Sequence, residues 1–333
     1  MIEHGDVVVE YEISEHALAE PFRIAKEVHN EVTTLTISIS YNGLVGRGEC
    51  NPYSVRGQNL ECVKADIEEV MPLLKAGFTR IAILDAMHAG PARNAVDCAL
   101  LDLECKQQQT SVSTILEVNQ LNTIYTAQTI GLISDDNESG LSKYSDFSIL
   151  KLKIDDETPQ ARLERLRRLA PEATLIVDAN GSLNFNALQK WLPVLEYNEV
   201  KILEQPVAPG DEELLKQVNR GTVLFCADES FIELRDLPKM REYYDVLNIK
   251  LDKIGGITAG LEAVRTAHKN ELQVLVGCML GTSLSAAPAW WLANEADFVD
   301  IDGPTMLLSD IANPMSWEKG AVAKPSTSLW GYE

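Results

Sequence analysis

The chain has 333 residues, 45% hydrophobic and 24% charged, with a formal net charge of −21. This length exceeds what one simple core usually holds, so we expect a large α/β domain with an appendage, or two domains. The negative charge argues against a nucleic-acid partner, because a phosphate backbone would be repelled, and no run of about 20 apolar residues predicts a membrane span.

The N-terminal part combines strand and helix patterns. Residues 7–13 and 33–50 alternate between apolar and polar side chains, as strands do, and Asn42-Gly43 predicts a hairpin turn. The apolar residues of 60–77 and 91–108 follow helical spacing instead. A β-meander followed by helices predicts an α+β unit.

From about residue 122 onward, short apolar runs alternate with amphipathic helical stretches. Eight runs have the composition of buried strands, at residues 126–132, 147–153, 173–178, 200–204, 222–228, 245–250, 272–277 and 297–302. Strands separated by single helices predict a (β/α)₈-type barrel. A doubly wound open sheet is the alternative, but no Gly-rich fingerprint follows the first strand and the regular units suit closure better.

Ionisable side chains recur where these predicted strands end, at Lys151, Lys153, Asp178, Glu204, Asp228, Lys250, Asp300 and Asp302. A single Asp at such a place is often a helix cap, and a single Lys is often solvated. Several together have a different meaning, because the carboxyl ends of barrel strands meet at the active site.

Three of these side chains, Asp178, Glu204 and Asp228, are carboxylates on successive strands. They would repel one another in a low-dielectric site unless a cation joins them. Oxygen-only ligands favour Mg²⁺, whereas zinc is disfavoured because the five histidines lie elsewhere.

The lysines predict proton transfer. Lys153 precedes the carboxylates in barrel order and Lys250 follows them, so the two face a metal-bound substrate from opposite sides. A neighbouring cation lowers the proton affinity of an amine, so Lys151 would lower the pKa of Lys153. Mg²⁺ would stabilise the enediolate formed when the carbon beside a carboxylate loses its proton. Two bases then permit a 1,1-proton transfer, which is racemisation or epimerisation.

These residues stand in motifs that resemble the enolase superfamily, specifically its muconate lactonising subgroup. The motifs are KLK at 151–153, DAN at 178–180, EQP at 204–206, ADES at 227–230 and NIKLDKIGGIT at 248–258. The resemblance covers essentially the whole chain. It implies an α/β protein with a (β/α)₇β TIM-type barrel at 119–315 and an α+β capping domain at 1–118, completed by residues 316–333.

The resemblance also implies roles for the motif residues. Asp178, Glu204 and Asp228 match the magnesium ligands of the superfamily. Lys153 and Lys250 match its two acid/base catalysts, with Lys151 as the supporting lysine. The superfamily uses such a base with Mg²⁺ to stabilise an enediolate.

The predicted eighth strand separates reactions within the subgroup. Asp300 and Asp302 lie two residues apart, and this pair is similar to the dipeptide epimerase motif that receives the substrate's ammonium group. The expected activity is therefore Mg²⁺-dependent epimerisation at the α-carbon of the C-terminal residue of a dipeptide. Family position also suggests Thr126, Cys278 and Leu280 as substrate contacts.

One departure concerns the choice of dipeptide. Family members that act on Ala-Glu carry an arginine in the first cap loop, and the matching position here is Glu27. Ala-Glu is therefore not the expected preferred substrate, and an acid there would suit a cationic second residue. Tyr53 and Arg56 offer further pocket groups, and Gly281 stands where related enzymes often have an acidic residue.

Other readings of the sequence stay open. Within the subgroup, the alternatives are an o-succinylbenzoate synthase or an N-acylamino acid racemase, although their substrates carry no ammonium group. From other classes, the alternatives are a Schiff-base aldolase on Lys153 or Lys250 and a non-catalytic binding protein. Six scattered cysteines without paired spacing indicate reduced thiols and a cytoplasmic location. Monomer and homo-oligomer are not distinguished.

Overall fold

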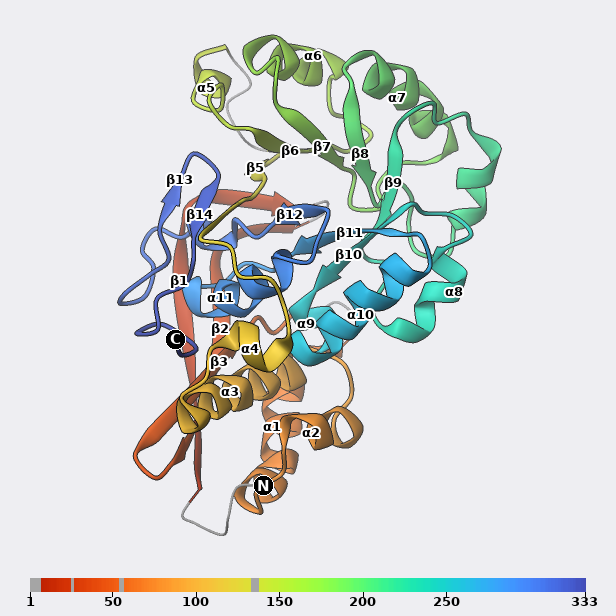
Figure 1. Cartoon of the computed structure of the whole chain (residues 1–333). Helices are drawn as coiled ribbons and strands as arrows, with labels where there is room; N and C mark the ends of the chain where they lie inside the picture. Colours follow the sequence, from red (N-terminus) through yellow and green to blue (C-terminus); the bar gives the residue numbers. More distant parts are fainter. Residues whose placement is uncertain (1–6, 25–26, 54–56, 133–137) are drawn as a thin grey trace.

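The computed structural model describes residues 7–24, 27–53, 57–132 and 138–333 (Figure 1). Its first part is an antiparallel sheet of β1 (Val8–Ile24), β2 (Glu27–Tyr41) and β3 (Leu44–Cys50). Asn42 and Gly43, both with positive φ, form the turn between β2 and β3, as predicted. Leu35, Ile37 and Ile39 alternate along β2 and are fully buried, so one face of the sheet forms a core.

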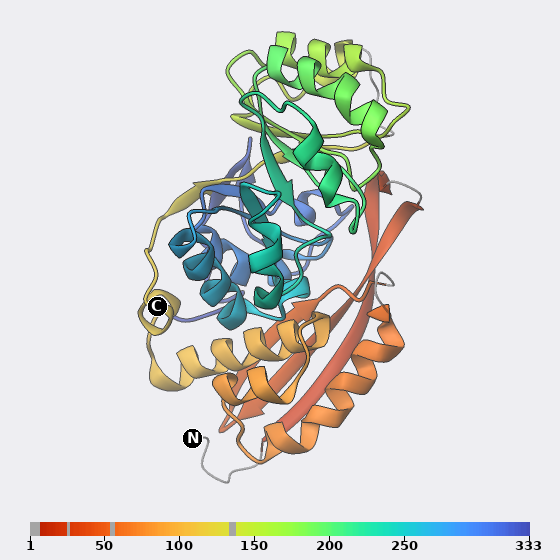
Figure 2. The same ribbon diagram turned by 90° about the vertical axis from the view of Figure 1, so that its right-hand side faces the viewer.

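β1 is longer than the sequence predicts. It continues to Ile24 after a register shift between Ala17 and Phe22, and with β2 it forms a long hairpin. In Figure 2 this red hairpin rises from the N-terminal sheet alongside the rest of the molecule. Leu18 forms a bridge with Leu307, so the hairpin contacts the C-terminal part of the chain.

Two helices, α1 (Leu60–Lys75) and α3 (Pro91–Gln108), pack on the buried face of this sheet. The short α2 (Arg80–Ala86) packs beside α3, and α4 (Val112–Leu116) follows α3 and packs into the core outside the barrel. The predicted helices at 60–77 and 91–108 are thus confirmed. α3 lies so close to β3 that a Cβ on Gly48 would be 2.1 Å from the carbonyl oxygen of Ala95.

The second part is an eight-stranded parallel sheet in which every strand pairs with the next one along the chain. Its strands are β5 (Gln128–Ile130), β6 (Ile149–Lys153), β7 (Thr174–Asp178), β8 (Val200–Glu204), β9 (Leu224–Ala227), β10 (Val246–Lys250), β11 (Gln273–Gly277) and β12 (Phe298–Asp300). The backbone N–H of Ala127 donates to Val299 O at 2.8 Å, which links the two edge strands. The predicted barrel is confirmed, and the open doubly wound sheet is wrong because strand order never reverses.

Two layers of apolar side chains hold the barrel together. Ala127, Ile176, Ile202, Cys226, Val246 and Leu275 fill its interior. A larger core lies between the strands and the outer helices. These helices are α5 (Glu138–Ser142), α6 (Gln160–Leu169), α7 (Phe185–Tyr197), α8 (Leu237–Met240), α9 (Leu251–Ile254), α10 (Ile257–Lys269) and α11 (Ser283–Ala293), with 3₁₀ turns η2 (Glu212–Gln217), η3 (Leu234–Asp236) and η4 (Gly303–Met306).

The C-terminal residues leave the barrel and return to the N-terminal part. β14 (Ala321–Ala323) pairs with β13 (Trp317–Glu318) on one side and with β4 (Thr123–Tyr125) on the other, in a small sheet. Farther on, the indole N–H of Trp330 donates to Arg47 O at 3.0 Å, and Gly331 N donates to Asp102 at 2.7 Å. None of the helices that the structure describes has the length and apolar character needed to cross a membrane.

Candidate active site

The ionisable residues at the strand ends lie side by side because of the sheet register. Lys153 on β6 is opposite Asp178 on β7, which is opposite Glu204 on β8. Lys250 on β10 lies in the matching row, where Gly277 of β11 separates it from Asp300. All these side chains except that of Lys250 are buried, and Lys250 is only slightly exposed.

A cavity of about 980 Å³ lies at this end of the barrel. Its described lining includes Lys151, Lys153, Asp228, Lys250, Asp300 and Asp302 from the barrel. The N-terminal part supplies Phe22 and residues 28–33 from the hairpin, and Asn51, Pro52 and Tyr53 after β3. The cavity is therefore bounded by both parts of the chain.

Lys151 is the most enclosed of the cations. Its Nζ lies 3.0 Å from Asp178, 2.8 Å from Glu204 and 2.8 Å from Asp300. Burial opposes the charge of Lys151, but the surrounding carboxylates outweigh burial and raise its pKa well above the usual value. Lys151 is thus held as an ammonium ion among three carboxylates.

Charge is unevenly distributed over the carboxylates. Burial opposes ionisation of Asp178, but Lys151 and Lys153 outweigh it and lower its pKa. Asp228 is likewise buried, and Lys250 and Lys253 lower its pKa. Burial and the charge of Asp178 raise the pKa of Glu204 to about 8, so this carboxylate needs more positive charge than the site provides.

Carboxylate oxygens such as those of Asp178, Glu204 and Asp228 are the kind of ligand that Mg²⁺ prefers. Glu204 Oε2 and Asp300 Oδ1 are buried without a hydrogen-bond donor among the described residues; the approach of Lys151 to Glu204 lacks hydrogen-bond alignment. As the side chains stand, no three described His, Cys, Asp or Glu residues form a group that could hold a metal ion, and Lys151 lies between Asp178 and Glu204. A cation that binds Asp178 and Glu204 competes with Lys151 for the same oxygens.

Lys153 and Lys250 reach the cavity from strands on either side of the carboxylates. Lys153 Nζ donates to Asp178 at 2.9 Å and to Asn180 at 2.8 Å, and it lies 5.7 Å from the centre of the Phe22 ring. Lys250 Nζ donates to Asp228 at 2.6 Å. Burial lowers the pKa of Lys250, but Asp228 outweighs it and raises the value. The expectation that Lys151 makes Lys153 more readily deprotonated stays a prediction.

The two acids of the last strand have different partners. Asp300 Oδ2 accepts from Lys151 at 2.8 Å. Asp302 accepts from the backbone N–H of Thr129 at 2.6 Å and from its hydroxyl at 3.3 Å. Burial and the charge of Asp300 raise the pKa of Asp302 to about 7. Both acids line the cavity, where a substrate cation would meet them.

The other predicted contacts divide into three groups. Cys278 and Leu280 line the cavity, as does Tyr53. Thr126 is not among the lining residues, because it precedes β5 and its hydroxyl accepts from Ile301 N at 2.8 Å. Thr129, three residues later, lies in the cavity wall instead. The side chain of Glu27 and all of Arg56 lie outside the described residues.

Four polar residues that support the site were not singled out from the sequence, although each lies in or beside a quoted motif. Lys253 Nζ donates to Asp228 O at 2.6 Å and to its Oδ1 at 2.5 Å. Asn248 donates to Glu204 at 2.9 Å, and Gln205 accepts from Asp228 N at 2.9 Å. Asn180 has φ of 43°, a strained backbone conformation that Asn tolerates, and accepts from Lys153.

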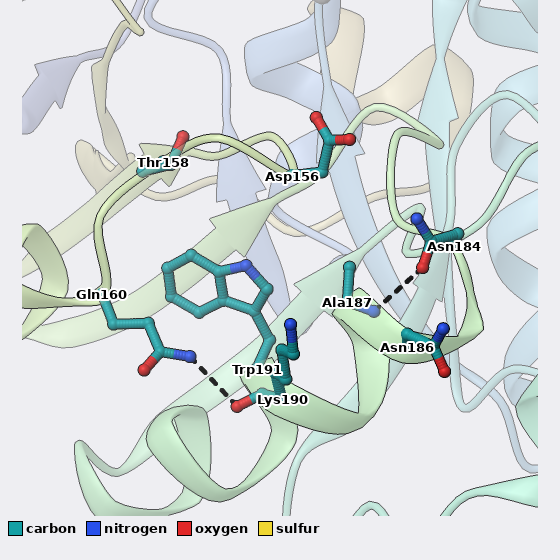
Figure 3. A pocket seen from close by; sticks show the side chains of 8 residues that line it. All are labelled: Asp156, Thr158, Gln160, Asn184, Asn186, Ala187, Lys190 and Trp191. Atoms are coloured by element: carbon teal, nitrogen blue, oxygen red, sulfur yellow. Dashed lines mark hydrogen bonds between the residues drawn. The ribbon is translucent and has the colours of Figure 1, made fainter.

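A second hollow of about 570 Å³ lies between the N-terminal ends of α6 and α7 (Figure 3). It is lined by Asp156, Thr158, Gln160, Asn184, Asn186, Ala187, Lys190 and Trp191. Asn184 caps α7 by accepting from Ala187 N at 3.0 Å, and Gln160 donates to Lys190 O at 3.1 Å. These contacts join two helices, and none of the strand-end residues lines this hollow, so the candidate active site is the larger cavity.

Comparison with known proteins agrees with this geometry. Residues 8–116 match the family model described as "Mandelate racemase / muconate lactonizing enzyme, N-terminal domain", and residues 137–328 match "Enolase C-terminal domain-like". An L-Ala-D/L-Glu epimerase of Escherichia coli (strain K12) is 34% identical, over 91% of this chain and 95% of its own length. An N-acetyl-D-glutamate racemase of Pseudoalteromonas sp. is 32% identical, over 89% of this chain and 95% of its own.

Solved structures show the same fold. An enolase family member from Agrobacterium tumefaciens with homology to dipeptide epimerases, with bound sodium and L-Ala-L-Glu, is 35% identical with a TM-score of 0.92. The match covers 98% of this chain and 100% of that one. A dipeptide epimerase from Enterococcus faecalis V583, complexed with Mg and L-Leu-L-Tyr, is 25% identical with a TM-score of 0.87, over 97% of this chain and 99% of that one.

Proposed function

Because the chain belongs to the mandelate racemase / muconate lactonizing enzyme family, we propose that it is a Mg²⁺-dependent dipeptide epimerase. It is an isomerase of the racemase and epimerase class, since relatives with such activities are 34% and 32% identical over most of its length. The proposed reaction inverts the α-carbon of the C-terminal residue of a dipeptide.

The observation that carries this proposal is the placement of Lys153 and Lys250. They reach one cavity from β6 and β10, with the strands that supply Asp178, Glu204 and Asp228 between them. An α-carbon held between two amines can lose a proton to one of them and gain a proton from the other on the opposite face. The exchange inverts the configuration and leaves the bonds of the dipeptide otherwise intact.

In the proposal, Asp178, Glu204 and Asp228 hold Mg²⁺. When bound, the ion supplies the positive charge that offsets the negative charge building on the substrate carboxylate as the α-proton leaves. Asn248 and Lys253 hold Glu204 and Asp228 in place for this role. Lys151 balances the remaining negative charge beside the ligands.

Asp300 and Asp302 are the proposed partners of the substrate's ammonium group. Both line the cavity, and buried cations require such a counter-charge. Asp300 pairs with Lys151, and Asp302 is held by Thr129 with a pKa that burial raises to about 7, so a substrate ammonium would favour the charged form of Asp302.

The remaining expectations also enter as proposals. Residues 1–118 with 316–333 form the cap, and 119–315 form the catalytic barrel. The tail contact of Trp330 with Arg47 supports this division. All six cysteines are free, which supports a cytoplasmic location.

The proposal is tested by incubating the protein with a dipeptide library, including L-Ala-L-Glu, in D₂O with Mg²⁺. Mass spectrometry should show deuterium gain in a subset of dipeptides, and chelation of the metal should abolish it. If no dipeptide exchanges while a succinylbenzoate precursor is converted, the proposal is wrong.

A second candidate, an N-acylamino acid racemase, is favoured by the similarity to the N-acetyl-D-glutamate racemase. Asp302→Asn separates the two, because an acylated substrate carries no ammonium group. If the protein is a dipeptide epimerase, this variant should raise KM for dipeptides by about tenfold or more, as expected when a charged hydrogen-bond partner is lost. Unchanged KM for dipeptides together with rapid racemisation of N-acetyl amino acids would favour the second candidate.

A further inference from the structure

Glu49 is a buried acid outside the proposed machinery. It lies on β3 of the N-terminal sheet and is only 2% exposed. Both of its oxygens accept hydrogen bonds from a barrel residue: Thr282 N donates to Oε1 at 2.8 Å, and Thr282 Oγ1 donates to Oε2 at 2.7 Å. A carboxylate with both oxygens paired to one residue fixes that residue's backbone and side chain together.

Thr282 stands at the junction of two elements. Its hydroxyl accepts from Leu284 N at 3.1 Å and so caps α11. On its other side, residues 278–281 connect it to the end of β11, and Cys278, Met279 and Leu280 of this segment line the cavity. Residues 278–281 thus form one wall of the cavity, and the position of Thr282 determines where that wall ends.

The segment is also packed tightly against the acid. A Cβ on Gly281 would lie 3.2 Å from Glu49 Oε1 and 2.5 Å from Ser285 Oγ, so the backbone approaches more closely than a side chain would allow. Asn51, two residues after Glu49, donates from Nδ2 to Leu280 O at 2.6 Å. Residues 49–51 thus hold this segment at Leu280 and, directly after it, at Thr282.

We propose that Glu49 is a positioning residue that fixes residues 278–281 as one wall of the substrate cavity. Glu49 does not line the cavity itself, so it acts through Thr282. The N-terminal part would then shape the cavity in two ways. The β1–β2 hairpin lines it directly, and Glu49 holds residues 278–281 in place through Thr282. The inference rests on the proposed function only for the choice of assay.

If Glu49 served only to stabilise the start of α11, its loss would act like the loss of any other contact there. Asp310 provides this comparison as a matched control. Asp310 holds the next residue of the same helix end, since Ser283 N donates to it at 3.0 Å and Ser283 Oγ at 2.5 Å. Asp310 does not line the cavity. Asp310→Asn therefore weakens the start of α11 without releasing the contact to Thr282.

The test compares Glu49→Ala, Thr282→Val and Asp310→Asn, with Glu49→Gln and Thr282→Ser as conservative variants. Glu49→Ala and Thr282→Val should raise KM for the dipeptide by about tenfold while kcat falls less than about threefold, because loss of ground-state contacts acts on KM. Asp310→Asn should leave KM within about twofold of the parent, and the two conservative variants should lie between the parent and the disruptive ones.

Hydrogen exchange followed by mass spectrometry gives a readout that needs no substrate. Glu49→Ala and Thr282→Val should speed exchange in the peptide that covers 278–282, and Asp310→Asn should not. Equal exchange in all three variants, or a fall in kcat with unchanged KM in Glu49→Ala, would overturn the inference. If the parent protein turns over no dipeptide, the proposed function fails, while the exchange result still decides the inference.

Discussion

Lys151 and Lys153 lie two residues apart on β6, yet their like charges are stabilised rather than opposed. Asp178 Oδ2 lies 3.0 Å from Lys151 Nζ and 2.9 Å from Lys153 Nζ, so one carboxylate oxygen separates the two ammonium groups. Lys151 Nζ also forms ion pairs with Glu204 and Asp300, whereas Lys153 Nζ donates a hydrogen bond to Asn180. At this scale, the partners on the neighbouring strands distinguish the surroundings of the two lysines.

The proposed two-base arrangement predicts opposite defects when Lys153 or Lys250 is removed. Lys153→Ala and Lys250→Ala should each abolish epimerisation, and each should retain α-proton exchange from one enantiomer only. Loss of a positioned acid or base typically lowers the rate by about 10²–10⁴-fold. Exchange of each enantiomer in D₂O is measured by mass spectrometry. Equal loss from both enantiomers in both variants would contradict the arrangement.

Glu49 predicts a pH-dependent stability. Burial raises its pKa from the usual 4.5 to about 7, although Thr282 opposes the shift. The folded state thus holds the proton more tightly than the unfolded one, so this contribution to the free energy of unfolding is full below pH 4.5 and is lost as the pH rises through 7. Glu49→Gln cannot ionise and should lack this loss.

Urea unfolding at pH 5 and pH 8 provides the measurement. Relative to Glu49→Gln, the parent protein should lose up to about 3 kcal/mol of unfolding free energy between these pH values, because the pKa of Glu49 is raised in the folded state. A constant difference between parent and Glu49→Gln at both pH values would show that Glu49 does not titrate in this range.

At the scale of elements, the close packing of β3 on α3 holds the N-terminal sheet against its helices. A Cβ on Gly46 would lie 2.1 Å from Ala99 O, and one on Gly48 would lie 2.1 Å from Ala95 O. These are backbone atoms of a buried helix and cannot move aside cheaply. Since Glu49 follows Gly48, the same contact fixes the strand from which it reaches Thr282.

Gly48→Ala should therefore lower the free energy of unfolding by about 3 kcal/mol or more, as overpacking against backbone does. Gly131→Ala is the matched control, because its added Cβ would meet only Phe22 at 3.6 Å. Chemical denaturation of both variants gives the comparison. Similar stability of the two variants would mean that β3 can move away from α3 at little cost.

At the scale of the whole molecule, the barrel gathers charge that the chain distributes widely. The protein carries a formal net charge of −21, yet Lys151, Lys153, Lys250 and Lys253 converge on its carboxylate cluster. Glu204 Oε2 still lacks a hydrogen-bond donor among the described residues, and burial and the charge of Asp178 raise the pKa of Glu204. An added divalent cation should thus bind the folded state preferentially.

Mg²⁺ should stabilise the protein against unfolding. A ligand at 100 times its dissociation constant adds about 2.7 kcal/mol to the unfolding free energy when it binds only the folded state. Thermal unfolding with and without Mg²⁺ measures the effect, and Asp178→Asn should diminish it. If Mg²⁺ stabilises that variant as much as the parent protein, Asp178 is not a ligand.

Most of the barrel could be predicted because each strand is a short apolar run with its own boundaries. The run predicted at 200–204 matches β8, and that at 147–153 ends where β6 ends. The extension of β1 beyond residue 13 could not be predicted in this way, because 14–24 contains polar residues and Pro21. It is a strand because β2 pairs with it and the barrel contacts it.

The sequence by itself determined the barrel and the row of ionisable residues at its strand ends, since parallel strands bring those ends to one place. Only the tertiary structure decided which groups pair. Lys151 meets Asp300 across 149 positions, and Glu49 meets Thr282 across 233. The start of β5 likewise decides that Thr129, and not the expected Thr126, lies in the described lining of the cavity. The physical reason is that such contacts depend on how separate elements pack, and no local pattern of apolar and polar residues records that packing.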